Sequence, residues 1–277
     1  MKLPSTNIIK RCLTTSALLC TLLAVSSMVQ ATTIKVTVTN NALVNGFTFT
    51  PLYTSFHNAD FDAFDVGSSA SAGVEALAEL GNASVLAGER LAADPDSVGG
   101  VILPTGGMRP LFPGEVGSQT FDISDPTNNM FFTFLSMILP SNDTFFGNDN
   151  ALQIFDLSGV FLGNQTINVT GADLWDAGTE ALNIDASPFI PGNDPTLSPA
   201  DGNNLIRAAE SLNAFAGFDL ANGQRLDASL IDFLSNPSAF NVATITIEEV
   251  PEPGTVSVLL LGLLGLGCAS RRRKNKV

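Results

Sequence analysis

The chain has 277 residues, and its 27 Asp and Glu residues outnumber its 13 Lys and Arg residues, giving a formal net charge of −14. Eight of the basic residues lie in residues 1–31 and 251–277, so the part between carries 26 acidic residues and five basic ones. A nucleic acid is excluded as a partner because there is no basic patch to neutralise phosphates, whereas cations are favoured. All three cysteines lie in the terminal segments, so the central part has no disulfide.

The first 31 residues have the three parts of a secretory signal peptide. Lys2, Lys10 and Arg11 form a basic start, residues 18–25 (LLCTLLAV) are apolar, and residues 29–31 (VQA) offer a cleavage pattern. The apolar part is too short for a membrane anchor, which needs about 20 residues. We therefore predict a signal peptide over residues 1–31 and export of the rest.

In chain order, strands come first. Residues 33–40 (TIKVTVTN) alternate apolar and polar side chains, which predicts a half-buried strand. Residues 46–57 predict a second strand, interrupted by Pro51. Residues 69–93 are rich in Ala, Leu and Glu and predict two short helices, capped by Ser68 or Ser69 and separated at Gly81.

The remaining elements are mostly strands joined by Gly- and Pro-rich loops. Residues 129–139 (NMFFTFLSMIL) are nearly all apolar and predict a central strand buried on both faces. The other predicted strands are 120–123, 151–157, 166–174 and 241–249, the loops are 99–117 and 188–204, and short helical insertions are 205–215 and 227–234. Many short strands in about 219 residues predict a mainly β fold, a single antiparallel β-sandwich domain over residues 32–250.

Two acidic loops are the candidate functional site. Asp143 directly follows the predicted central strand, and Asp176 and Glu180 flank an Ala-Gly-Thr turn in which Gly178 permits a positive φ. Carboxylates with nearby carbonyl groups suit a hard cation such as calcium, which takes about 6–8 oxygen ligands. The alternative is a solvated acidic loop, which the spacing alone favours in so acidic a chain.

Enzymatic motifs are weak. The only histidine, His57, follows Ser55 by two residues, but no nucleophile elbow surrounds this pair, and a structural, hydrogen-bonded histidine is the favoured interpretation. One histidine without cysteines is a poor basis for a zinc site. We expect no catalytic residues and no enzymatic activity.

The C-terminal segment combines three features in order. Residues 250–254 (VPEPG) precede an apolar stretch at 255–270, and Arg271, Arg272, Arg273 and Lys274 follow. This segment resembles the PEP-CTERM sorting signal of Gram-negative bacteria. The resemblance implies a short transmembrane helix over 255–270 within a sorting segment at 251–277, transient anchoring in the inner membrane, cleavage by an exosortase-type enzyme, and delivery to the cell surface or extracellular matrix.

Four stretches carry a second resemblance. They are residues 51–82, 109–123 (RPLFPGEVGSQTFDI), 135–147 (LSMILPSNDTFFG) and 175–183 (WDAGTEALN). Together they resemble the spondin N-terminal domain family, in which a β-sandwich binds calcium through an Asp after a Pro-Ser motif and two acids flanking Ala-Gly-Thr. The matching residues here are Asp143, Asp176 and Glu180, although Glu180 stands where animal members tend to have Asp.

The two resemblances imply a function. We expect an exported, surface-sorted, calcium-binding adhesion or extracellular-matrix protein whose partner is a matrix polysaccharide or a surface protein. The alternatives are a calcium-stabilised secreted enzyme and a structural protein associated with exopolysaccharide. Residues 191–227 lie outside the resemblance and receive no predicted role.

Overall fold

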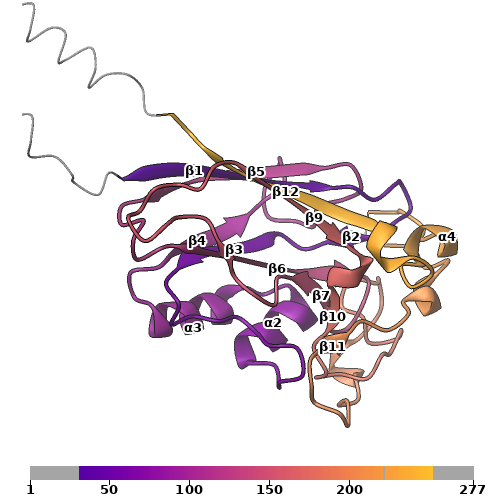
Figure 1. The fold of residues 1–277 in the computed structure, drawn as a ribbon. Coiled ribbons are helices and arrows are strands. Elements are labelled where there is room, and N and C mark those ends of the chain that lie inside the picture. Colours follow the sequence, from indigo (N-terminus) through magenta and orange to yellow (C-terminus); the bar gives the residue numbers. More distant parts are fainter. Residues whose placement is uncertain (1–30, 221, 252–277) are drawn as a thin grey trace, which may run out of the picture.

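Two antiparallel sheets stacked face to face form the body of the protein (Figure 1). The computed structural model describes residues 31–220 and 222–251. Helices α2 (Ala72–Leu80) and α3 (Ser84–Ala93) cover the outer face of one sheet. The arrangement confirms the predicted class, a mainly β, antiparallel fold with few short helices.

The first sheet brings the two ends of the described chain together. Its strand order is β5-β1-β12-β9, formed by Val116–Ile123, Thr32–Asn40, Asn241–Glu249 and Gln165–Thr170. Successive side chains of β1 and β12 point to opposite faces of the sheet, so every second side chain faces the other sheet. Val36 lies opposite Ile247 and Val38 opposite Ile245, and all four are fully buried. Both strands were predicted from this alternation.

The second sheet is covered on both faces. Its strand order is β11-β10-β7-β6-β3-β4. These strands are, in the same order, Arg207–Ala208, Leu174–Asp176, Thr144–Gly147, Phe131–Leu139, Leu52–His57 and Val98–Ile102. Two short strands, β2 (Thr48–Phe49) and β8 (Leu152–Gln153), also pair with β6. Phe132 and Phe134 of β6 pack in the core between the sheets, and Leu135 packs in a second core under the helices. The prediction of a central strand buried on both faces is therefore confirmed.

The two predicted helices form, with the break where it was expected. Gly81 ends α2 in the left-handed region at φ 66°, where its N–H reaches back to the carbonyls of the last turn. The predicted cap was wrong, because Ser71 and not Ser68 or Ser69 accepts the Val74 N–H. Glu89 of α3 accepts hydrogen bonds from Ser71 Oγ and Gly73 N, which ties the two helices together.

Several predicted elements differ from the structure, among them the predicted strand 151–157, which forms a strand over Leu152–Gln153, β8. Residues 166–174 form two strands in opposite sheets, because Thr170 and Asp173 make a capping box around a 3-10 turn, η1 (Gly171–Asp173). The predicted loop 99–117 contains most of β4, whose Gly99 and Gly100 pair with β3. The predicted helix at 205–215 is instead β11 followed by a 3-10 turn, η3 (Asn213–Phe215), since tertiary pairing overrides local propensity.

The other connecting segments contain little regular structure. The regular elements in these segments are α4 (Ala228–Ile231), which lies inside the predicted helix 227–234, and the 3-10 turns η2 (Pro195–Leu197) and η4 (Pro237–Ala239). The predicted signal peptide at 1–31, apart from Ala31, and the predicted sorting helix at 255–270 lie outside the described residues. Within residues 31–220 and 222–251, no helix is long and apolar enough to cross a membrane.

Candidate functional site

Asp143 lies in the turn between β6 and β7, directly before β7 begins, and it is 2% exposed. The turn is closed by Ser141, whose hydroxyl donates to the Ile138 carbonyl and accepts the Thr144 N–H. Asp143 Oδ2 accepts the N–H groups of Thr179 and Glu180 at 3.2 and 3.1 Å. One carboxylate oxygen therefore holds the loop after β10 against the turn after β6.

Asp176 ends β10 and pairs with Thr144 of β7, the residue after Asp143, and the Ala177 N–H then bonds the Asp143 carbonyl. Its Oδ1 accepts the Gly178 N–H at 2.8 Å, which forms the tight turn that the sequence predicted. Gly178 has φ 71°, and a Cβ there would lie 2.4 Å from the Leu205 carbonyl oxygen. Glycine is therefore required at this position for its backbone conformation and for space.

Arg207 is the residue of this candidate site that the sequence did not reveal. It pairs with Asp176 across β10 and β11, and its Nη2 lies 2.9 Å from Asp176 Oδ2. The same nitrogen contacts Asp201 and lies 3.6 Å from Glu210. The only indication in the sequence was that basic residues are rare, because Arg207 is one of five between residues 32 and 250.

Burial and mutual repulsion make this an unusual acidic site. Burial, followed by the charge of Asp176, raises the pKa of Asp143 to about 7. Burial also raises the pKa of Asp176 to about 6, against the opposing effects of the Gly178 N–H and Arg207. On α2, burial raises the pKa of Glu79 to about 7, and the charges of Glu180 and Glu75 add to this. The positive charge near these carboxylates is too small to stabilise all of them in the ionised form.

Glu180 is joined to Asp143 by its backbone rather than its carboxylate. Its side chain is half-buried, and burial raises its pKa while a hydrogen bond from Ser198 opposes the rise. Together with Glu79 it lines a cavity of about 220 Å³ beside α2.

In the part of the chain that the structure describes, no three His, Cys, Asp or Glu side chains are grouped to hold a metal. The Asp143–Asp176 pair fits the oxygen chemistry of calcium, but Arg207 occupies one oxygen of that pair.

Two further contacts fasten the acidic loops to their surroundings. Trp175 donates its Nε1–H to the Gly147 carbonyl at 3.0 Å and packs near Phe64, which holds β10 against the helix-covered core. Asn142 donates to the Ala181 carbonyl at 2.7 Å, so it also fastens the acidic loop to the turn. The two loops that the sequence paired are therefore held together by hydrogen bonds.

His57 is buried in β3 and uses both ring nitrogens. Nδ1 lies 2.6 Å from the Asn58 carbonyl, and Nε2 lies 2.9 Å from Thr133 Oγ1. Burial lowers its pKa, which favours the neutral ring. Ser55 makes no hydrogen bond with His57, so the structure does not assemble the Ser55–His57 pair considered from the sequence.

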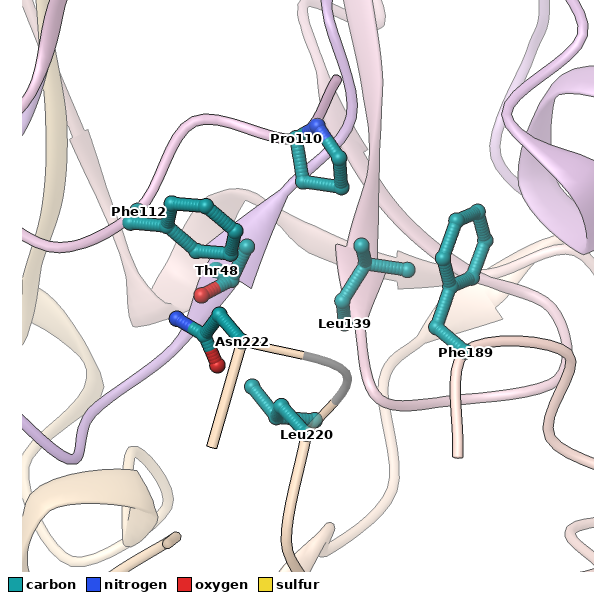
Figure 2. A pocket seen from close by; sticks show the side chains of 7 residues that line it. All are labelled: Thr48, Pro110, Phe112, Leu139, Phe189, Leu220 and Asn222. Atoms are coloured by element: carbon teal, nitrogen blue, oxygen red, sulfur yellow. The ribbon is translucent and has the colours of Figure 1, made fainter. Parts of the chain in front are cut away.

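A separate, apolar pocket of about 190 Å³ lies near β2 (Figure 2). Its walls are Thr48, Pro110, Phe112, Leu139, Phe189, Leu220 and Asn222. None of these side chains titrates near neutral pH, and the buried Thr48 hydroxyl has no hydrogen-bond partner among the described residues. This pocket offers apolar contact and two polar groups, but no acid or base for catalysis.

Comparison with known families gives two matches. The sequence model described as Spondin_N matches residues 39–198, and the one described as PEP-CTERM protein-sorting motif matches residues 249–274. No curated protein matches the chain. Asp143, Asp176 and Glu180 fall inside the first match, whereas Arg207 falls outside it.

The pKa values predict how stability depends on pH. In a chelator, raising the pH from about 4 to about 7 should lower the free energy of unfolding, because the folded protein holds protons on Asp143, Asp176 and Glu79 that the unfolded chain has already released. Chemical denaturation at several pH values measures this. Asp143→Asn should flatten the dependence, and a wild-type stability that rises across this range would contradict the assignment.

The hydrogen bonds of His57 predict a structural role. His57→Gln loses one of two buried ring contacts and should lower the free energy of unfolding by about 1–3 kcal/mol. Calcium binding, measured by calorimetry, should be unchanged. A variant with normal stability that loses a binding or catalytic activity would instead assign His57 to function.

Proposed function

The chain belongs to the Spondin_N family, and from this premise we propose that it is a calcium-binding adhesion or matrix domain. The protein is exported and sorted to the cell surface or extracellular space of a Gram-negative bacterium, and its C-terminal motif implies processing by an exosortase-type enzyme. The proposed mature domain spans residues 32–250, and the proposed calcium residues are Asp143, Asp176 and Glu180.

The observation that carries this proposal is the pair of buried carboxylates, Asp143 and Asp176. After burial, the charge of Asp176 is the next largest cause of the raised pKa of Asp143, so the two ionised carboxylates repel each other. A divalent cation would supply the missing positive charge and favour the ionised form of both groups. Calcium binding should therefore release protons, and it should strengthen as the pH rises.

The chain's own residues prepare this site. Asp143 holds the backbone of residues 179 and 180, Gly178 lets the loop turn, and Asp176 stands beside Asp143. Arg207 competes with calcium for Asp176, because one guanidinium nitrogen already bonds its Oδ2. The proposed site thus gains affinity when Arg207 moves toward Asp201 or Glu210, its other partners.

An adhesion or matrix role fits the surface address and the site. Calcium would fix the conformation of two loops at one end of the sandwich, and a partner could bind to the surface that these loops form. A calcium-stabilised enzyme needs a polar pocket with a general acid or base. The apolar pocket in Figure 2 has neither, but a second pocket of about 210 Å³ is lined by His57 and Asp62, so the secreted enzyme stays the alternative function. Binding assays with matrix polysaccharide and with surface proteins separate a structural, polysaccharide-associated role from adhesion.

The calcium site is tested by charge removal. Calcium at a hundredfold excess over its Kd should stabilise the wild-type domain by about 2.7 kcal/mol. Asp176→Asn should remove most of that gain, as measured by melting in calcium and in chelator. The control Asp96→Asn changes an exposed carboxylate and should leave the gain intact.

A second variant tests the competition by Arg207. Arg207→Gln should bind calcium more tightly than the wild type in calorimetry, and it should be less stable than the wild type in chelator. If Asp176→Asn and Asp96→Asn respond to calcium like the wild type, the proposed residues bind no calcium and the buried carboxylates have a purely structural role.

The sorting motif predicts a processed C-terminus. Intact mass spectrometry of protein released from the native host's surface should find a chain that lacks residues 1–31 and ends near residues 251–254, because the motif lies there. Disruption of the exosortase-type enzyme should leave the chain membrane-associated. Recovery of Arg271 to Arg273 on surface protein would contradict the processing step.

A further inference from the structure

A row of polar side chains lies on the helix-facing side of β3, away from the acidic loops. Alternation along the strand directs Tyr53, Ser55 and His57 to this side, while Leu52 and Phe56 face the other sheet. Tyr53 is 1% exposed and Ser55 is 0% exposed. Polar groups at this depth normally have hydrogen-bond partners, because burying one without a partner is costly.

Arg90 of α3 extends onto this row and is 6% exposed. Ser55 pairs with Gly99 of β4, and a Cβ on Gly99 would lie 1.7 Å from Arg90 Nη1. The missing side chain at Gly99 therefore makes the room in which the guanidinium lies. This gives Gly99 a packing reason inside a strand, where glycine is otherwise unfavourable.

Four buried polar atoms in this cluster have no hydrogen-bond partner among the described residues. They are Tyr53 Oη, Ser55 Oγ, Arg90 Nε and Arg90 Nη1. The cluster is compact, because burial raises the pKa of Tyr53 while the Arg90 charge and the adjacent Ser55 hydroxyl both lower it. Tyr53 therefore keeps its proton and can donate it.

The Arg90 charge also lacks a carboxylate. Within residues 31–220 and 222–251, no Asp or Glu oxygen lies within 4.0 Å of its guanidinium. The adjacent Glu89 is engaged by Ser71 and Gly73 on the other helix. Asp94, one turn later, accepts hydrogen bonds from Asn58, Asp96 and Asn128. A buried, unpaired cation is among the most unfavourable arrangements in a protein interior.

We propose that Arg90, Tyr53 and Ser55 form a binding site for a small monovalent anion of the halide class, with chloride as the physiological ion. All four free atoms can donate a hydrogen bond, since both hydroxyl hydrogens rotate. One anion can accept all four and neutralise the guanidinium. A water molecule accepts only two hydrogen bonds and brings no charge. The burial of the cluster between α3 and the sheet selects a small ion.

The first test is halide-dependent stability. The domain is melted in chelator, at constant ionic strength, while sodium chloride replaces sodium gluconate, so calcium binding at the acidic loops plays no part. The melting temperature should rise and then saturate with chloride, and bromide should act similarly. Arg90→Met should abolish this rise. Arg109→Gln, which changes an arginine paired with Glu115 near the surface, should preserve it.

Two milder variants keep the test decisive if Arg90→Met does not fold. Tyr53→Phe and Ser55→Ala each remove one donor and retain the charge, so each should weaken halide affinity by about fivefold to tenfold. Crystals soaked in bromide should show an anomalous peak beside Arg90 Nε. A melting temperature independent of halide, an ordered water in place of the peak, or bromide that binds without stabilising the protein would each overturn the proposal.

Discussion

Coverage of the second sheet on both faces is the constraint on which both polar clusters depend. The first sheet packs on one face and α2 and α3 on the other, so a polar side chain there is removed from water (Figure 1). In such an environment charge must be matched locally. Asp143 and Asp176 leave negative charge in excess at the turns of β7 and β10, and Arg90 leaves positive charge in excess beneath α3. The two clusters lie on different elements, and the calcium and anion sites proposed above would each add the missing opposite charge.

The sequence predicted those parts of the fold in which one physical signal dominates. Alternation on β1 and β12, and the apolar run of β6, are enforced by burial, so the strands follow directly from the pattern. β4 was missed because Gly99 and Gly100 are typical of a loop, and the lack of space at Gly99 beside the Arg90 guanidinium and the Thr54 carbonyl appears only in the folded protein. The split between β9 and β10 depends on the capping contact of Thr170 and Asp173, which competes with strand continuation over one turn.

The candidate site was predictable in its loops but not in its charge balance. The positions of Asp143, Asp176 and Gly178 follow from strand ends and a turn residue, which are local properties. Arg207 is 31 positions beyond Asp176 in a segment without a motif, and only the pairing of β10 with β11 brings it there. Glu180 shows the converse, since sequence spacing placed it with Asp143 but could not show that its backbone, rather than its carboxylate, makes the contact.

The segment that follows the Spondin_N match covers the acidic loops. It supplies β11, the Arg207 guanidinium and the Leu205 carbonyl that packs against Gly178. In this chain the turn at Gly178 is enclosed by residues from outside the matched region. Changes in residues 199–210 are therefore a means of adjusting this site without altering the turn itself.

The position of β12 has a mechanical consequence. This strand lies between β1 and β9, and the Val250 N–H still bonds the Thr33 carbonyl at 2.8 Å where the described chain ends. β10 and β11 lie on the other side of the molecule in Figure 1. Tension applied between residue 250 and the loops after β6 and β10 would run along β12 and load both of its hydrogen-bond ladders in shear. Because bonds in shear share the load instead of opening one by one, this arrangement resists mechanical unfolding from the C-terminal end.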